Sequence, residues 1–438
     1  QNSLLIIASY YFYACWDWKF LFLLVFSTFL DYFTGIMIEK NETDSKRKFW
    51  FWLSVLVNLG FLGIFKYYNF FATSFTELIN GFGFQVNPLL IKVILPVGIS
   101  FYTFHGLSYV IDIYYKRIKA ETNFIDYSLF VSYFPLLVAG PIERATHLLP
   151  QVKVKRVFNF QKAKEGIHQI IWGLVKKVVI ADSCAMYANE VFNNHEQMNS
   201  LSLVLGAIYF AFQIYGDFSG YSDIALGTSK LFGIDLLKNF NFPYFSRDIA
   251  EFWRRWHISL SSWFRDYLYI PLGGSKGGKW MQVRNTFIIF LVSGFWHGAN
   301  WTFIAWGLIN AIYFLPLLLL NRNRSNLEDI TFKWNVEGLR TILNILLTFS
   351  ITTFAWIFFR AKSISDALLY IKKMFTNLNF DIQYLGNERY APELLVLVGV
   401  FVLFEWFHKY KTEPISGKYE NVKLLFCIMA ILALGVFS

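Results

Sequence analysis

The sequence of 438 residues is short of charge, because Asp, Glu, Lys and Arg make up 16% of it, whereas a soluble domain carries about 25%. Cysteine is scarce too: Cys15, Cys184 and Cys427 lie far apart and form no CxxC pair, so the sequence contains no disulfide framework. With 27 glycines and 10 prolines, a collagen-like chain is excluded. The 20% share of aromatic residues excludes a disordered chain.

What the sequence has instead is apolar segments along almost its whole length, and 55% of its residues are hydrophobic. A helix needs about 20 residues to cross a hydrocarbon core of about 30 Å. Candidate spans are residues 3–16, 20–38, 49–73, 89–115, 167–187, 201–226, 339–359, 393–408 and 421–437, with a tight turn at 16–19 between the first two. We therefore predict one all-α, polytopic membrane domain over residues 1–438, with about ten to eleven transmembrane or re-entrant helices.

The loops differ in charge, and the net charge of the chain is +10. Basic residues gather in 39–48, 116–119 and 227–284, whereas 74–88 and 188–200 contain no Lys or Arg. Because Lys and Arg mark the cytoplasmic side of membrane proteins, we place the basic loops in the cytoplasm. Beyond residue 320 the charges leave the orientation open.

Two segments do not fit a simple alternation of spans. Residues 125–140 are flanked by basic residues on both sides and contain Pro135, which favours a re-entrant or half-crossing helix. Residues 286–320 would form a helix of about 52 Å, too long for one crossing. A hairpin fits better, with a first arm of about 16 Å over 286–296 and its apex at 294–300. This arm length places His297 near the bilayer midplane.

Seven histidines are present, but no HExxH pair and no Cys/His spacing typical of zinc sites. The GxSxG elbow, the Walker loop and GxGxxG are also absent. Metal hydrolases, serine hydrolases and ATP-driven pumps therefore lose their usual signatures, and we predict no metal site. An ionisable residue inside a membrane is costly to bury, which makes His297 the leading functional candidate.

Residues 248–274 predict an amphipathic helix at the membrane interface, ended by Pro271 and two glycines. The basic residues beside His257 favour binding of a polyphosphate-bearing cofactor. A polar run at 213–223, which includes Asp217, lies inside an apolar span and must face protein or water. An interhelical hydrogen-bond network and a channel lining both explain this run.

The sequence resembles the membrane-bound O-acyltransferase superfamily, and within it the bacterial alginate O-acetylation branch. The matching stretches are ASYYFYACWDWKFLFLLVFSTFLDY, LPVGISFYTFHGLSYVIDIY, AGPIER, DFSGYSDIALG, FPYFSRDIAEFWRRWHISLSSWFRDYLYIPLGGSKGG and RNTFIIFLVSGFWHGANWTFIAWG. The D-alanine exporters of teichoic acid synthesis share the RWH and WHG elements. The LYIPLGGSKGG run is similar to the acetylation branch.

This resemblance implies a catalytic histidine in the WHG motif, His297, and a second histidine in the RWH motif, His257. It also implies a cytoplasmic tunnel that meets an outward-facing funnel. We expect the donor and substrate channel to include Trp296, Asn300, Asp217, Arg254, Arg255 and Asp266. Because relatives in the family extend past both ends, we expect the sequence to be clipped at its ends.

We therefore predict transfer of an acyl group, most simply acetyl, from a cytoplasmic thioester such as acetyl-CoA to a hydroxyl beyond the membrane. His297 would be the general base, and His257 would orient the donor or bond the thioester carbonyl. The acceptor would be a glycan or a partner acetyltransferase protein, the site the inner membrane of a bacterium, and no cofactor would stay bound. The alternatives are D-alanyl transfer to teichoic acid, a transporter, and a scaffold without chemistry.

Overall fold

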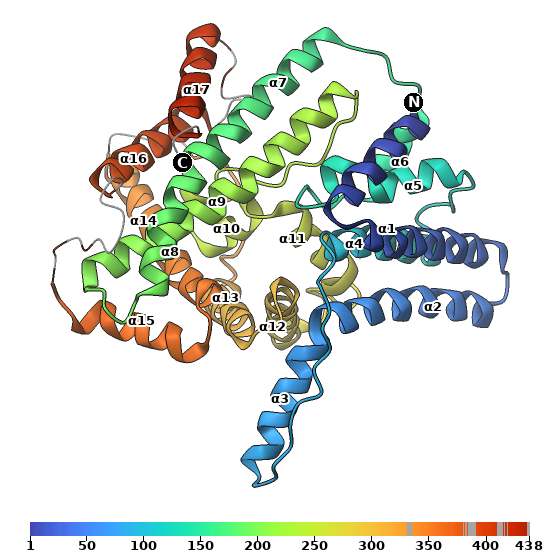
Figure 1. Cartoon of the computed structure of the whole chain (residues 1–438), viewed down its shortest axis with the longest axis horizontal. Helices are drawn as coiled ribbons and strands as arrows, with labels where there is room; N and C mark the ends of the chain where they lie inside the picture. Colours follow the sequence, from blue (N-terminus) through green and yellow to red (C-terminus); the bar gives the residue numbers. More distant parts are fainter. Residues whose placement is uncertain are drawn as a thin grey trace. The chain divides into compact units, whose positions relative to one another are not determined.

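The structure is a computed structural model of the whole chain (Figure 1). It describes residues 1–330, 335–379, 381, 383, 391–409, 415, 417 and 419–435. The chain forms two compact units, one made of Gln1–Asn159 and Ser229–Leu237, the other of Phe160–Thr228 and Lys238–Ser438. We call them unit 1 and unit 2. Every regular element in the described residues is helical, which confirms the predicted all-α class.

Unit 1 contains six α-helices. They are α1 (Asn2–Lys40), α2 (Asp44–Leu62), α3 (Tyr68–Gly81), α4 (Ile99–Tyr114), α5 (Phe124–Ser132) and α6 (Ala145–Lys153). Helix α1 packs against α2, α4 and α5. Its course is interrupted at Asp17, whose backbone is extended, with φ −159° and ψ 109°. The predicted turn between the first two apolar spans is therefore confirmed as a break inside α1.

The predicted span at 89–115 is wrong in its first third. Helix α4 begins only at Ile99, and residues 84–96 are not helical. Gly98 has a φ of 75°, a left-handed conformation that a helix interior does not allow, and Pro88 and Pro96 lack the N–H that a helix needs. At 125–140 the nine residues of α5 cover about 14 Å, which agrees with less than a full crossing.

Unit 2 contains eleven α-helices among its described residues. They are α7 (Phe160–Leu174), α8 (Asp182–Asn193), α9 (Ser200–Leu231, its last three residues in unit 1), α10 (Ile249–Arg255), α11 (Ile258–Phe264), α12 (Gly278–His297), α13 (Trp301–Leu319), α14 (Val336–Arg360), α15 (Ile364–Thr376), α16 (Ala391–His408) and α17 (Glu420–Gly435). Two π-helical segments, η3 (Val175–Ala181) and η5 (Arg265–Tyr269), interrupt this pattern.

The predicted hairpin is present as α12 and α13, which pack along each other and turn at residues 298–300 (Figure 1). At its base, Nζ of Lys279 donates a 3.0 Å hydrogen bond to the carbonyl oxygen of Leu319. The first arm is longer than predicted: its 20 residues rise about 30 Å rather than 16 Å. The length of this arm therefore no longer places His297 at the midplane.

Five helical segments among the described residues are long and apolar enough to cross a membrane. They are Asn2–Lys40, Asp44–Gly81, Ser200–Leu231, Trp301–Leu319 and Val336–Arg360. Because they are spread over both units, the chain is a multi-pass membrane protein.

Candidate active site

His257 lies at a break between two short helices, where we predicted one continuous amphipathic helix. Its backbone is left-handed, with φ 44° and ψ 54°, so α10 ends at Arg255 and α11 starts at Ile258. The placement of this segment at the membrane interface stays a prediction. The apolar residues Trp256 and Leu260 are only 3% and 4% exposed, and Trp256 belongs to the hydrophobic core of unit 2.

The His257 ring is buried in a polar and aromatic cage. Its Nδ1 lies 2.9 Å from Oδ1 of Asn239, and the same oxygen accepts a 2.9 Å hydrogen bond from Oγ of Ser259. Phe218 of α9 meets the ring edge-on, with 4.6 Å between the centroids. Burial lowers the pKa of His257 well below its usual value, and the charge of His297 lowers it further. His257 is therefore neutral at pH 7, and His297 is near enough to influence it.

The hydrogen bonds around Asn239 determine which nitrogen of His257 carries the proton. The backbone N–H of Ser259, which can only donate, points to the side-chain oxygen of Asn239 at 3.4 Å. Because this oxygen accepts, Nδ1 of His257 must donate to it. In the neutral ring the proton is then on Nδ1, and Nε2 keeps a lone pair.

His297 is the last residue of α12, and its half-buried ring lies between two aromatic side chains. The ring of Trp306 in α13 meets it edge-on, with 5.2 Å between centroids. Phe359 in α14 contacts it at 5.3 Å. The hairpin apex and the end of α14 thus position this histidine together.

Three tryptophans, which we call the tryptophan wall, form a row of ring contacts between the surroundings of the two histidines. Trp306 stacks on Trp356 at 5.5 Å, and Trp356 contacts Trp256, the neighbour of His257, at 5.0 Å. All three rings are almost completely buried. Trp306 also contacts His297. His297 therefore lies at one end of the tryptophan wall, and His257 follows Trp256 at the other end.

Of the predicted channel residues, Asn300 and Trp296 lie beside His297. Asn300 caps α13, because its Oδ1 accepts from the backbone N–H of Thr302, and its Nδ2 donates to the carbonyl oxygen of Lys362 at 2.9 Å. Trp296 precedes His297 in the last turn of α12 and is half-buried. Both residues therefore belong to the hairpin apex.

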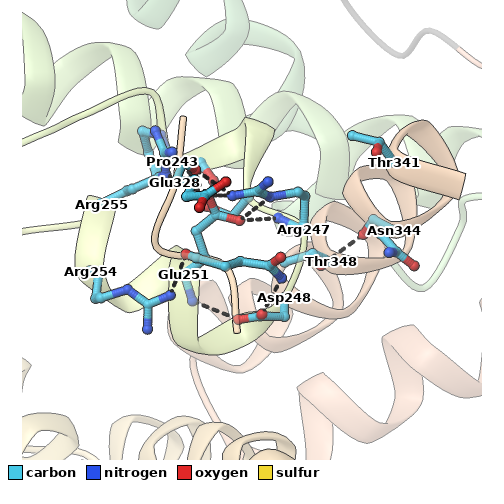
Figure 2. A network of polar contacts seen from close by, with 12 residues as sticks. Pro243, Arg247, Asp248, Glu251, Arg254, Arg255, Glu328, Thr341, Asn344 and Thr348 are labelled. Atoms are coloured by element: carbon cyan, nitrogen blue, oxygen red, sulfur yellow. Dashed lines mark hydrogen bonds and ion pairs between the residues drawn. The ribbon is translucent and has the colours of Figure 1, made fainter. Parts of the chain in front are cut away.

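Arg254 and Arg255 lie in the last turn of α10, where they bind protein groups (Figure 2). Arg254 donates to the carbonyl oxygens of Asn323 and Asn326, at 2.8 Å and 2.9 Å. Nη2 of Arg255 lies 2.9 Å from Oε1 of Glu251, a buried carboxylate that also pairs with Arg247 (Figure 2). Both arginines thus fix the helix break that positions His257.

Asp217 and Asp266 each form an ion pair with a basic side chain. Asp217 has a side chain that is 56% exposed and forms an ion pair of 2.7 Å with Lys177. Asp266 in η5 pairs with its neighbour Arg265, also at 2.7 Å. The polar run on α9 that contains Asp217 supplies a hydrogen-bond network through Asp223, which lies 3.0 Å from Lys176. Of the two explanations of that run, the structure contains the interhelical hydrogen-bond network.

Sequence reasoning missed Asn239, Trp306 and Trp356. Asn239 lies in a loop without regular structure, and no spacing in the sequence connects it with His257. The tryptophans look like any other apolar residues of a span. Among the described residues, no group of three or more His, Cys, Asp or Glu side chains is placed to hold a metal ion.

Comparison with known proteins decides the family. The sequence pattern of the membrane-bound O-acyltransferase family matches residues 113–359, a range that contains both histidines and the tryptophan wall. This chain belongs to that family. It is 38% identical over 95% of its length to the probable alginate O-acetylase of Pseudomonas aeruginosa, of which it covers 78%.

A peptidoglycan O-acetyltransferase of Helicobacter pylori is equally similar, at 38% identity over 89% of this chain and 76% of the relative. The teichoic acid D-alanyltransferase of Bacillus subtilis is 29% identical over 61% of this chain and 69% of the relative. As a family member with O-acetyltransferase relatives, the protein is an O-acyltransferase of the membrane.

Proposed function

We propose that this membrane-bound O-acyltransferase moves an acetyl group from a cytoplasmic thioester, most simply acetyl-CoA, to a hydroxyl of an extracytoplasmic polysaccharide or of a partner acetyltransferase protein. It acts in the inner membrane of a bacterium. About ten to eleven transmembrane or re-entrant helices surround a tunnel that joins the two sides. The observation that carries this proposal is the pair of histidines at the ends of the tryptophan wall.

His297 is the general base in this mechanism. The acceptor hydroxyl attacks the carbonyl carbon of the thioester while the imidazole takes its proton, a contribution of about 10²–10⁴ in rate. The C–S bond then breaks, and the thiolate leaves with the proton from the imidazolium. The rings of Trp306 and Phe359 keep the His297 ring in one orientation and exclude water from the reacting thioester.

His257 orients the donor. With the proton on Nδ1, its Nε2 accepts a hydrogen bond but cannot donate one. A hydrogen bond to the thioester carbonyl would need an N–H group on the ring nitrogen. The hydrogen bonds of Asn239 therefore favour the other predicted role of His257, which is to orient the acyl donor. The pantetheine arm of an acyl-CoA offers amide N–H groups to Nε2. Arg254 and Arg255 support this site by holding the helix break, and in this proposal they also attract the phosphates of the donor by their charge.

Two features support acetyl transfer rather than D-alanyl transfer. The O-acetylating relatives are 38% identical to this chain, against 29% for the teichoic acid D-alanyltransferase. The wall beside His297 is built from tryptophan and phenylalanine rings, which suit an uncharged acetyl group better than an ammonium-bearing alanyl group that needs a carboxylate partner.

The test uses purified protein in liposomes, with labelled acetyl-CoA on one side and a glycan acceptor with its partner protein on the other. We expect His297→Ala to lower label transfer at least 100-fold while acetyl-CoA binding is retained. The control is His408→Ala, on α16, whose Nδ1 bonds to the Phe404 carbonyl of its own helix at 2.8 Å. Equal transfer by wild type and His297→Ala would mean that His297 is not the general base. No transfer by any of the proteins would favour a scaffold without chemistry.

A further inference from the structure

A small cavity lies at the end of α14, beside the hairpin apex. It has a volume of about 160 Å³. Its lining includes Phe192, His195, Arg360, Lys362, Asp366 and Tyr370, all from unit 2. At about 30 Å³ per water molecule, this space equals about five waters, enough for a carboxylate or phosphate group. None of these residues belongs to the mechanism derived above.

The cavity is tied to the candidate active site by its backbone. Phe359 contacts the ring of His297, and Arg360 is the next residue of α14. On the other side of Arg360, the carbonyl oxygen of Lys362 accepts the hydrogen bond from Asn300. His297 and the cavity thus lie beside the same end of α14.

The cavity lies at the opposite end of α14 from the basic loop that we place in the cytoplasm. Arg254 binds Asn323 and Asn326 of the loop that leads into α14. The 25 residues of α14 rise about 37 Å from there, enough to cross the hydrocarbon core. His195, from the 188–200 loop that lacks Lys and Arg, closes the cavity at this end. This is the side from which an acceptor arrives.

The charge of the lining is positive. The guanidinium of Arg360 donates to Oδ1 of Asn189 at 2.7 Å and lies over the ring of Phe192, but no carboxylate of the described residues pairs with it. Lys362 is exposed at the rim, and Asp366 is the single acid among the lining residues. A half-buried guanidinium without an anionic partner is a strong site for an oxyanion, which it can bind through two parallel hydrogen bonds.

His195 adds a third group. Its Nδ1 lies 3.1 Å from the carbonyl oxygen of Phe192, so this nitrogen carries a proton. Its Nε2 is buried and has no hydrogen-bond partner in the described part of the chain. The ring lies parallel to that of Tyr370, at 6.2 Å, which holds it in place. In its protonated form, Nε2 would donate to an anion bound at Arg360.

We propose that the cavity formed by Arg360, Lys362 and His195 binds a carboxylate or phosphate oxyanion of the acceptor. The bound group then positions a hydroxyl of the adjacent residue of the acceptor chain at His297. The proposal rests on the proposed acyl transfer for its acceptor. It makes the natural acceptor an acidic molecule, a uronic-acid glycan in the carboxylate case and a phosphate-bearing polymer in the other.

Three acceptors of matched length test the site: a neutral oligosaccharide, its uronic acid counterpart and a phosphorylated one. For Arg360→Gln we expect KM for an anionic acceptor to rise about 10–100-fold with kcat nearly unchanged, and KM for the neutral acceptor to stay as in wild type. Arg360→Lys should recover part of the loss. Lys372→Gln, an exposed lysine on α15 outside the cavity, is the matched control.

The acceptor whose KM rises in Arg360→Gln identifies the group that the cavity binds, a carboxylate or a phosphate. An equal change for the neutral acceptor, or no change for any acceptor, would overturn the proposal. A binding experiment separates it from the proposed function. Calorimetry on wild type and Arg360→Gln in nanodiscs, with the uronic acid oligosaccharide and the phosphorylated one as titrants, needs no catalysis. Loss of anion binding in the variant supports the cavity even if no acyl transfer is found, and equal binding by both proteins contradicts it.

Discussion

Nδ1 of His257 donates a 2.9 Å hydrogen bond to Oδ1 of Asn239, and this contact determines the tautomer of the buried imidazole. Replacing Asn239 with Ala removes the acceptor and leaves Nδ1–H buried without a partner. We expect kcat of acyl transfer to fall about 10–100-fold because the ring can rotate or change tautomer. The measurement is acetyl transfer in liposomes at pH 7.5. The control is Ser222→Ala, which removes only the 3.2 Å contact to Nδ2 of Asn239.

The variant Asn239→Asp keeps an acceptor but adds a negative charge beside the ring. In wild type, burial lowers the pKa of His257, so the ring stays neutral as the pH falls from 8 to 6. A carboxylate favours the charged form and raises this pKa. The variant should therefore lose more activity than wild type on going from pH 8 to pH 6. Parallel pH profiles for the two proteins would contradict the assigned proton on Nδ1.

Lys176 and Lys177 are adjacent in η3 but differ in burial. Lys176 is buried, 3.0 Å from Asp223 and 3.6 Å from Glu405. Lys176→Met leaves the buried carboxylate of Glu405 and the partly buried one of Asp223 without their cation, which should cost about 3–5 kcal/mol in the free energy of unfolding. Lys177 has a side chain that is 43% exposed, and Lys177→Met should cost less than about 1 kcal/mol.

Unfolding of these two variants by SDS in mixed micelles gives the comparison. Adding Asp223→Asn to Lys176→Met should recover part of the loss, because one of the two unpaired charges is then removed. Equal stabilities for the two single variants would mean that the buried network contributes no more than the exposed pair.

Gly294 permits the close approach of α12 and α13. A Cβ at this position would lie 2.2 Å from the carbonyl oxygen of Phe303, a backbone atom that cannot move away without shifting α13. We expect Gly294→Ala to destabilise the protein by about 1–3 kcal/mol and to lower activity by displacing His297. Gly399→Ala on α16, where a Cβ meets nothing within 4 Å, should be neutral or stabilising by up to about 1 kcal/mol. Thermal unfolding in detergent distinguishes the two.

His147 of α6 is bonded through Nδ1 to the buried carboxylate of Glu143 at 2.7 Å, and this hydrogen bond raises the pKa of the ring. A raised pKa in the folded state means that the contact stabilises fully below about pH 6.5 and that its contribution is lost as the pH rises through the folded value. The effect should stay below about 1 kcal/mol, because the His147 side chain is 36% exposed. Melting temperatures at pH 6 and pH 8 for wild type and His147→Gln check this, with a smaller drop expected in the variant.

The sequence by itself determined the class of the protein and the location of its main elements. Apolar runs of about 20 residues predict spanning helices because a helix satisfies its backbone hydrogen bonds within a single segment, and the spans at 201–226 and 339–359 became α9 and α14. The hairpin with His297 at its apex followed from a run too long for one crossing between basic residues. The family followed from the motifs around the two histidines.

Only the tertiary structure decided the surroundings of those histidines. The break at His257 depends on a left-handed backbone and on the ion pairs that Glu251 makes with Arg247 and Arg255, and helical periodicity does not detect it. The partnership of His257 with Asn239, and the wall of Trp256, Trp356 and Trp306, join residues from different helices and loops. Composition and spacing describe one segment at a time. Contacts between distant segments arise when the helices pack, and packing gives each buried polar group its partner.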